Sequence, residues 1–302
     1  EMQRSLVGSE MCIRDRYHIK FVPLRLVYQG GEVRDRLEVS AEQVYDMLSR
    51  EIPKTSLPLP EDVLRVYDEL ADEGYTDAVH ISISSGLSGT YNMVRILASE
   101  YKRLNVRVVD SKTLSMQEGL IVLSCARLLE KTQDVEEIAA YAVALREKSL
   151  GMFVIRTLEY LRKGGRIGLV EGVLGTMLQI KPVIFVNTDG IYQTIAKARG
   201  HVNALDAMLR EMARQEACHA KQFGAVYFLK TGKKACPGRP DAPCVTCINE
   251  TLRQRYSEEH AAHEAYEALA ENAGTHRCML LKIAEEECSH AQMILCILQT
   301  CL

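Results

Sequence analysis

Hydroxyl and glycine residues are concentrated in the segment SSGLSGT at residues 84–90, between a strand-like apolar stretch and a helical pattern. Glycines allow a ligand to approach the backbone closely, because they carry no side chain. The hydroxyls of Ser85, Ser88 and Thr90, together with free amide groups at the start of a helix, favour an anionic ligand. Taken alone, the same pattern is more typical of a capped helix after a glycine-rich turn.

Motifs of several enzyme classes are absent from the sequence. There is no GxxxxGK[ST] or GxGxxG phosphate-binding loop and no HExxH metal motif, and Ser88 lies in GLSGT rather than in the G-x-S-x-G elbow of hydrolases. His80 shares one face of an expected strand with Ser82, where a histidine is more often packed than catalytic. A site rich in hydroxyls and poor in titratable groups suits binding better than acid–base chemistry. The enzymatic alternative is a small-molecule hydrolase or transferase that uses Ser85 or Ser88 with His80.

The hydroxyl-rich segment belongs to a pattern of alternating strands and helices, which predicts an α/β fold with a parallel sheet and flanking helices. The expected strands of this first domain cover residues 22–27, 78–84 and 106–109, and the expected helices cover 40–48, 60–74, 91–101, 117–131 and 135–148. Ligands of parallel sheets bind at the carboxyl ends of the strands. We therefore expect Thr55–Ser56, Ser84–Ser85 and Asp110–Ser111 to meet at one sheet edge.

A second, smaller α/β domain is expected to begin near residue 150. Its expected elements are strands at 152–156, 182–186 and 191–197 and helices at 157–168, 170–180 and 201–214. Asp189–Gly190, between the last two strands, is the strongest hairpin signal in the chain, because these residue types tolerate the positive φ of a tight turn. The two domains are therefore expected at residues 17–150 and 151–217.

The composition fits a globular protein. The chain has 302 residues, of which 47% are hydrophobic and 25% charged, and this suits two domains with buried cores. The formal net charge of -3 gives no indication of nucleic-acid binding. No apolar run reaches the roughly 18 residues of a membrane span. All of the ten cysteines except Cys12 and Cys125 follow residue 217, unlike those of a secreted disulfide scaffold, which favours a reducing cytoplasm.

Both ends of the chain differ from its middle. Residues 10–16 read EMCIRDR, which resembles the translation of a transposase sequencing adapter, and we interpret residues 1–16 as an assembly artefact. Residues 218–302 are an atypical tail, rich in cysteine and partly helical near 257–272 and 278–302. Cys244 and Cys247 have zinc-ligand spacing, but no second pair follows, so a zinc-binding regulatory module is the weakest of three hypotheses. We assign no catalytic residue, metal ligand or cofactor.

Several motifs resemble the DegV family, the bacterial fatty-acid-binding proteins of the fatty-acid kinase system. They are KTSLPLP at 54–60, SISSGLSGTYN at 82–92, DSKTLSMQEGL at 110–120, LEYLRKGGRIG at 158–168, and KPV followed by DG within 181–190. The resemblance implies a two-domain α/β fold with a long-chain fatty acid buried between the domains. It also implies a cytoplasmic lipid carrier of phospholipid metabolism that is not itself an enzyme and presents the carboxylate to a separate ATP-dependent kinase.

The family pattern further implies the residues of the ligand site. The carboxylate is expected on the hydroxyls of Thr55 and Ser85, with Arg166 as a basic residue near the head group. The remaining expected ligand-binding residues are Ser56, Ser84, Gly86, Ser88 and Gly89. Family members usually begin with a strand that runs into an Asp-Ser loop and end with a segment that carries a histidine. Neither has an equivalent here, so we expect the first strand to be missing and assign no histidine.

Overall fold

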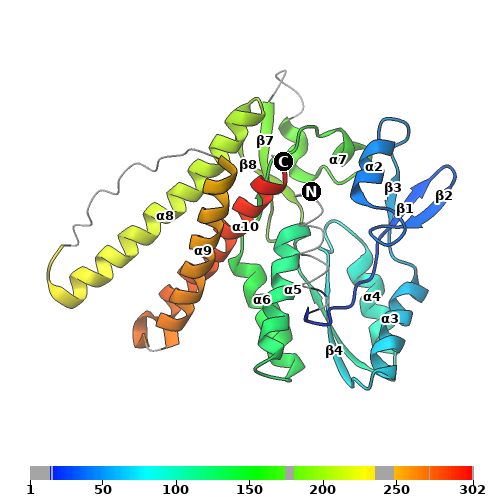
Figure 1. Cartoon of the computed structure of the whole chain (residues 1–302), viewed down its shortest axis with the longest axis horizontal. Helices are drawn as coiled ribbons and strands as arrows, with labels where there is room; N and C mark the ends of the chain where they lie inside the picture. Colours follow the sequence, from blue (N-terminus) through cyan, green and yellow to red (C-terminus); the bar gives the residue numbers. More distant parts are fainter. Residues whose placement is uncertain (1–13, 15, 174–179, 235–247, 272, 301–302) are drawn as a thin grey trace. The chain divides into compact units, whose positions relative to one another are not determined.

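The computed structural model describes residues 14, 16–173, 180–234, 248–271 and 273–300 (Figure 1). The chain divides into two compact units: unit 1 comprises residues 1–147, 158–168 and 187–191, and unit 2 comprises residues 148–157, 169–186 and 192–302. Both units combine strands with helices, which confirms the predicted α/β class. Within the described ranges, no helix has the length and apolar character needed to cross a membrane.

A small antiparallel sheet opens unit 1. Its strands are β1 (Arg25–Tyr28), β2 (Gly31–Arg34) and β3 (Lys54–Ser56), in the order β2-β1-β3. Helix α2 (Ala41–Met47) follows β2 and starts at Ser40, whose hydroxyl accepts the Gln43 N–H while the Gln43 side chain accepts the Ser40 N–H. This is the predicted capping box, and it satisfies two amide groups at the start of the segment.

The predicted parallel sheet consists, in the part of the chain that the structure describes, of β4 (Asp77–Ser82) and β5 (Asn105–Asp110). One face packs against α3 (Pro60–Asp72) and α4 (Thr90–Glu100), and the other packs against α5 (Ser115–Leu129) and α6 (Val135–Lys148). Alternation along the strands separates the two faces: Ala78, Val106 and Val108 on the first, and Val79, Ile81 and Val109 on the second. Ser82 and Asp110 pair in register, so the carboxyl ends of the two strands lie side by side.

The predictions for the first sheet need one correction. Thr55–Ser56, which we expected at the edge of the parallel sheet, lies in β3 and pairs antiparallel with β1. The two-residue connection Gln29–Gly30 makes β1 and β2 antiparallel, and β3 pairs with the other side of β1, so all three strands form a sheet separate from the parallel one. Thr55 is therefore not placed by the parallel-strand rule on which the sequence prediction relied.

Unit 2 is built on an antiparallel sheet of β6 (Met152–Phe153), β7 (Ile180–Val186) and β8 (Tyr192–Arg199), in the order β6-β7-β8. Strands β7 and β8 form the predicted hairpin. Buried Val183 of the sheet packs in one core with Ala204, Met208 and Met212 of α8 (His201–Thr231). Helix α8 continues far beyond its predicted end near residue 214 and passes without a break through residue 217. It stops at Gly232, whose φ of 69° is the left-handed conformation common after helices.

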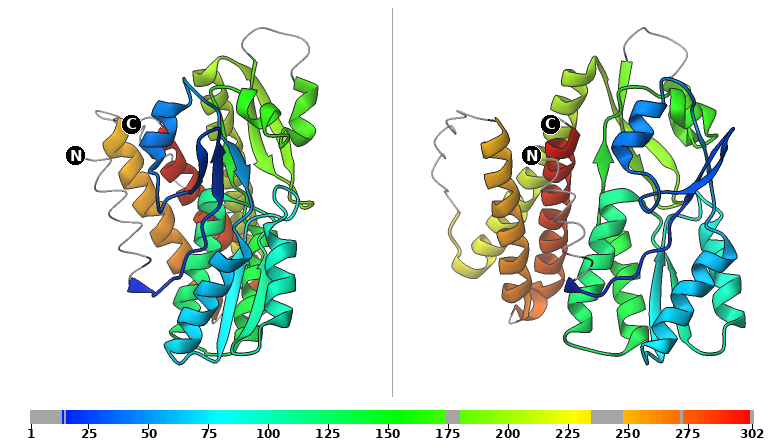
Figure 2. Two further views of the ribbon diagram at one scale, coloured as in Figure 1. Left: turned by 90° about the vertical axis from the view of Figure 1, so that its right-hand side faces the viewer. Right: turned by 45° about the vertical axis from the view of Figure 1, so that its right-hand side comes forward.

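Three long helices of unit 2 lie side by side (Figures 1 and 2). They are α8, α9 (Ile248–Glu271) and α10 (Arg277–Thr300), and the short 3-10 helix η2 (Gly274–His276) joins the last two. Helices α9 and α10 pack against each other and correspond to the helical segments predicted for the tail.

Two short elements complete the description: α7 (Glu159–Lys163) in unit 1, and the 3-10 helix η1 (Gly168–Val173). The helix predicted at 170–180 is thus a 3-10 turn as far as Val173, and residues 174–179 lie outside the described residues.

Candidate functional site

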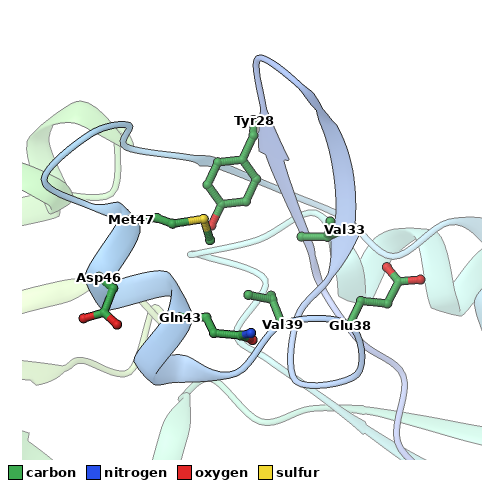
Figure 3. A pocket seen from close by; sticks show the side chains of 7 residues that line it. All are labelled: Tyr28, Val33, Glu38, Val39, Gln43, Asp46 and Met47. Carbon is green, nitrogen blue, oxygen red and sulfur yellow. The ribbon is translucent and has the colours of Figure 1, made fainter.

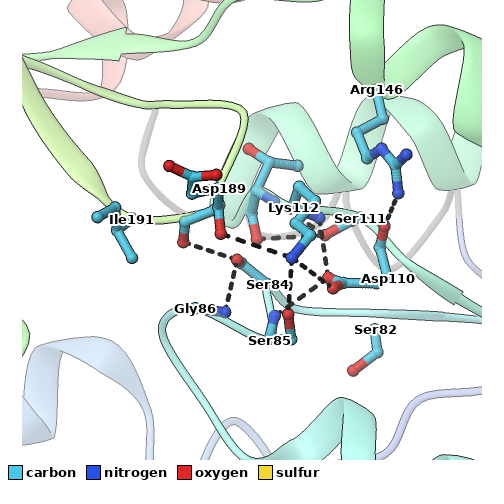
Figure 4. A network of polar contacts seen from close by, with 12 residues as sticks. Ser82, Ser84, Ser85, Gly86, Asp110, Ser111, Lys112, Arg146, Asp189 and Ile191 are labelled. Carbon is cyan, nitrogen blue, oxygen red and sulfur yellow. Dashed lines mark hydrogen bonds and ion pairs between the residues drawn. The ribbon is translucent and has the colours of Figure 1, made fainter.

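Ser84 anchors the loop that leaves β4. It is fully buried, and its N–H donates to the Thr113 carbonyl at 2.8 Å. Its hydroxyl donates to the Gly190 carbonyl at 2.7 Å and accepts the Gly86 N–H at 3.1 Å (Figure 4). Ser84 therefore joins three segments of unit 1 that are distant in sequence, and backbone groups surround its hydroxyl.

Gly86 and Gly190 make this anchor possible by their lack of a side chain. A Cβ atom on Gly86 would lie 2.6 Å from the Gly190 carbonyl oxygen, and one on Gly190 would lie 2.1 Å from the Ser84 hydroxyl oxygen. Gly190 also has a φ of +82°, a conformation that other residues rarely adopt. The predicted Asp189–Gly190 turn thus joins β7 to β8 and also packs against the loop that follows β4.

Ser85 presents a half-exposed hydroxyl beside a cation. Nζ of Lys112 donates to the Ser85 hydroxyl at 2.9 Å and lies 3.2 Å from Oδ2 of Asp110. Oδ1 of Asp110 accepts the N–H groups of Ser85 at 3.0 Å and Lys112 at 3.1 Å, and Arg146 donates to the Asp110 carbonyl at 2.9 Å (Figure 4). Lys112 has a φ of 52°, an uncommon conformation outside glycine that is often found at functional sites. The edge of the parallel sheet therefore holds a hydroxyl and an ammonium group over a buried carboxylate.

Two carboxyl groups near this edge have opposite pKa shifts. Burial acts to raise the pKa of Asp110, but hydrogen bonds from Ser85 and Lys112 outweigh it, so the pKa lies below its ordinary value. Burial, with a contribution from the charge of Asp110, raises the pKa of Glu118 on α5 to about 8. At neutral pH Asp110 is therefore ionised while Glu118 is protonated, because their environments separate the two pKa values.

The raised pKa of Glu118 predicts a pH-dependent stability. The unfolded chain releases this proton near 4.5 and the folded chain near 8, so the stabilisation is complete below the first value and disappears as the pH rises through the second. Between these limits the free energy of unfolding falls by about 1.4 kcal/mol per pH unit from this group alone. Glu118→Gln removes this pH dependence. The free energy of unfolding of the variant minus that of wild type, measured by urea unfolding, is therefore expected to increase by about 1–3 kcal/mol from pH 6 to pH 8. Glu130→Gln, at the exposed end of the same helix, is the control, and equal slopes for Glu118→Gln and wild type would contradict the prediction.

The remaining residues expected in the loop lie at the start of α4. The Ser88 hydroxyl is 2.8 Å from the Thr90 hydroxyl, and Gly89 precedes the first helical residue. Arg166, from the segment after α7, reaches the same loop and donates through Nε to the Leu87 carbonyl at 3.2 Å. The structure thus brings the guanidinium of Arg166 to the hydroxyl-rich loop across a long sequence separation.

Thr55 and Ser56 are exposed on β3. The next residue, Leu57, places its terminal methyl carbons 3.6 Å from where a Cβ atom on Gly89 would lie. The end of β3 therefore borders the loop, although Thr55 itself pairs with Leu26 of β1. The Thr55 hydroxyl is exposed on the surface of the antiparallel sheet. The hydrogen bonds of Ser85 described above are made with Asp110 and Lys112 and not with Thr55.

His80 gives no support to the hydrolase alternative. Its Nδ1 lies 3.0 Å from the Tyr67 hydroxyl, and burial lowers the pKa of His80 to about 4. The Ser85 hydroxyl faces Lys112 and the Ser88 hydroxyl faces Thr90. A serine nucleophile needs a histidine within hydrogen-bond reach, and these residues do not form that arrangement.

A pocket of about 390 Å³ lies elsewhere in unit 1 (Figure 3). It is lined by Tyr28, Val33, Glu38, Val39, Gln43, Asp46 and Met47. None of the expected ligand-binding residues is among them, and the carboxylates of Glu38 and Asp46 disfavour an anionic head group. We therefore centre the candidate site on Ser85 and Lys112 and not on this pocket.

Lys112 is the residue of this site that the sequence analysis did not select. The signal that points to it is the sequence Asp110-Ser111-Lys112 directly after β5, beside the loop that follows β4. As for metals, the cluster of possible ligands found among the described residues is Glu259, Glu287 and His290 of unit 2. The zinc pair considered above, Cys244 and Cys247, lies outside the described residues.

Comparisons with known proteins agree on one family. Residues 9–237 match the family model described as "Uncharacterised protein, DegV family". A DegV domain-containing protein of Clostridium acetobutylicum is 37% identical over 200 residues, covering 66% of this chain and 71% of that protein. The structure of a fatty-acid-binding DegV family protein of Thermus thermophilus matches with 34% identity and a TM-score of 0.60, covering 67% of this chain and 71% of that one. A stearic-acid-binding protein of Eubacterium ventriosum matches with 25% identity and a TM-score of 0.59, covering 70% and 74%. The chain therefore belongs to the DegV family.

Proposed function

We propose that this protein binds a long-chain fatty acid and presents its carboxylate, at the loop of residues 84–89, to a separate ATP-dependent fatty-acid kinase. The observation that carries the proposal is the Ser85 hydroxyl 2.9 Å from the Lys112 ammonium at a half-exposed sheet edge. The fatty-acid-binding members of the family with solved structures support the choice of ligand.

The local charges suit a carboxylate. Lys112 supplies a positive charge, Ser85 supplies a hydroxyl donor, and Arg166 adds a second cation at the same loop. Hydrogen bonds to charged groups are stronger than neutral ones, so these donors are well matched to an ionised acid. Thr55, on the neighbouring β3, is proposed as a further hydroxyl donor to the carboxylate. Ser56, Gly86, Ser88 and Gly89 border the head group, and Ser84 fixes the loop.

Most of the binding energy is expected from the acyl chain. About a dozen methylenes buried at roughly 0.8 kcal/mol each contribute on the order of 10 kcal/mol. This is comparable with association costs of roughly 4–15 kcal/mol, so the hydroxyls and cations serve mainly to orient the carboxylate. An oriented and partly exposed carboxylate is what a kinase needs as its acceptor.

We assign the phosphoryl transfer to the partner kinase and the location to the cytoplasm. The hydroxyls of the loop face Lys112, Thr90 and backbone groups, which suits binding rather than acid–base catalysis. Among the residues that the structure describes, Cys125, Cys218 and Cys278 are free thiols, which suits a reducing compartment. Acyl phosphate is expected when the loaded protein is mixed with ATP and kinase, and its formation without the kinase would contradict this assignment.

Native mass spectrometry of the purified protein tests the ligand. We expect wild type to carry co-purified fatty acid and the double variant Ser85→Ala with Thr55→Ala to lose most of it, because both hydroxyl donors are removed. Ser85→Ala keeps the main-chain hydrogen bond to Asp110, so the loop retains its position. Ser99→Ala, an exposed serine of α4 that donates to its own helix backbone, is the matched control and keeps the ligand. A ligand-free spectrum from folded wild-type protein would overturn the proposal.

A further inference from the structure

The helices of unit 2 enclose a cluster of histidine and glutamate side chains. His219 comes from α8, Glu259 from α9, and Glu287 and His290 from α10. These helices lie side by side (Figures 1 and 2), so residues far apart in the sequence converge in their interior. Glu259, Glu287 and His290 follow residue 237, where the match to the DegV family ends, so these three members of the cluster lie beyond that match.

The cluster is compact and buried. The ligand atoms of Glu259, Glu287 and His290 all lie within 4.8 Å of one another. Nδ1 of His290 is 3.5 Å from Glu287 and 3.7 Å from Glu259. Relative exposure is 0% for His290, 5% for Glu287 and 6% for Glu259. Two carboxylates and one imidazole thus face a common point away from water.

His219 supports this group from α8. It is 3% exposed, its Nδ1 lies 3.4 Å from Glu287, and its Nε2 contacts Glu286. Its ring centroid is 6.0 Å from that of His290. Histidines and carboxylates that hold a metal ligand in place commonly make such contacts, which fix the orientation of the ligand.

The burial of two carboxylates in one cluster is costly unless positive charge compensates them, and Arg255 of α9, which donates to Glu259 at 3.0 Å, supplies part of that charge. Like charges in close proximity repel, and buried ions are normally paired or bound to metal. Glu287 lies between the two histidines of the cluster, 3.4 Å from Nδ1 of His219 and 3.5 Å from Nδ1 of His290.

The spacing along the helices agrees with this geometry. Glu287 and His290 are three residues apart, which places both on one face of α10. Helical bundles that bind iron or manganese use such glutamate–histidine pairs together with single glutamates from facing helices.

We propose that α8, α9 and α10 form a binding site for a divalent first-row transition metal ion, with Glu259, Glu287 and His290 as ligands and His219 as a positioning residue. Mixed carboxylate and imidazole ligands without thiolate suit manganese, iron, cobalt or zinc. The proposed site is independent of the fatty-acid site, because it shares no residue with the loop of unit 1.

Cobalt titration of the full-length protein, stripped with a chelator, tests this site. We expect Co(II) to bind with visible d–d bands typical of oxygen and nitrogen ligands and without the near-ultraviolet bands of thiolate ligation. Glu259→Gln is expected to weaken Co(II) binding by at least about tenfold, and His219→Gln by roughly 10–100-fold. The matched control is Glu250→Gln, an exposed glutamate in the first turn of α9, which keeps wild-type affinity.

Thermal unfolding supplies a second measurement. Co(II) is expected to raise the melting temperature of wild type and Glu250→Gln but not that of Glu259→Gln, because a ligand that binds the folded state stabilises it. The wild-type spectrum decides the question even if Glu259→Gln fails to fold. The proposal is overturned if folded wild type binds no Co(II) at millimolar concentration. It is also overturned if bound Co(II) shows thiolate bands, since these would place the metal on the cysteines.

Discussion

Gly190→Ala is expected to lower the free energy of unfolding by on the order of 3 kcal/mol, through overpacking combined with backbone strain. The new Cβ atom would lie 2.1 Å from the Ser84 hydroxyl oxygen and 2.9 Å from Cδ of Lys112. Movement of the flexible Lys112 side chain can relieve the second contact, but the first cannot be relieved because Ser84 is fully buried. The hydrogen bond from Ser84 to the Gly190 carbonyl is therefore lost, and with it the anchor of the site loop. Urea unfolding of the variant and wild type measures the effect.

Gly74→Ala separates the packing contribution from the strain contribution. Gly74 follows α3 in the same unit and has a φ of +92°, similar to the +82° of Gly190, but a Cβ atom there would meet nothing within 4 Å. Its replacement is expected to cost only about 1 kcal/mol, from the positive φ. Equal losses for the two variants would show that the close contact of Gly190 with Ser84 contributes nothing. Fatty-acid binding is expected to weaken in Gly190→Ala and to stay unchanged in Gly74→Ala.

Local sequence patterns predict much of this fold. Ser40 and Gln43 form the expected capping box, and Asp189–Gly190 forms the expected hairpin turn. Each of these features depends on residues a few positions apart, so turn chemistry and capping suffice to identify it. The contact of Ser84 with Gly190 spans 106 residues, and no local pattern specifies it. The sequence therefore predicts the turn but not its contact with the loop that follows β4.

The site was predicted less completely than the fold, for two physical reasons. A lysine such as Lys112 is most often a solvated surface residue, and its contact with Ser85 depends on the position of the β5 end beside the loop after β4. The proposed metal cluster requires α9 to pack against α10, so Glu259 and His290 cannot be paired from the sequence alone. Helix α8 also extends beyond its predicted end, because His219 contacts Glu286 of α10 and Phe223 stacks on Tyr266 of α9.

Lys112→Met is expected to weaken fatty-acid binding by roughly 10–100-fold, because a hydrogen bond to a charged group contributes about 1.5–3 kcal/mol. The variant loses the cation beside Ser85 and leaves the ionised Asp110 unopposed near the incoming carboxylate. Both changes act in the same direction, since like charges repel. Lys112→Arg keeps the positive charge and is expected to retain most of the affinity. Displacement of a fluorescent fatty-acid analogue from delipidated protein measures the dissociation constants.

The affinity of Lys112→Met also distinguishes a ligand role from a structural one. In Lys112→Met the buried Asp110 keeps the main-chain N–H donors of Ser85 and Lys112 but loses its ion pair, so the variant is expected to fold and to unfold at a lower urea concentration than wild type. Lys102→Met, in the exposed segment after α4, controls for loss of surface charge. An unchanged dissociation constant in Lys112→Met would mean that the ammonium group only holds Asp110. If only Lys112→Met loses fatty-acid affinity, and if the difference from wild type becomes smaller at high salt, the ammonium group contacts the fatty-acid carboxylate. Salt has this effect because screening weakens exposed charge interactions.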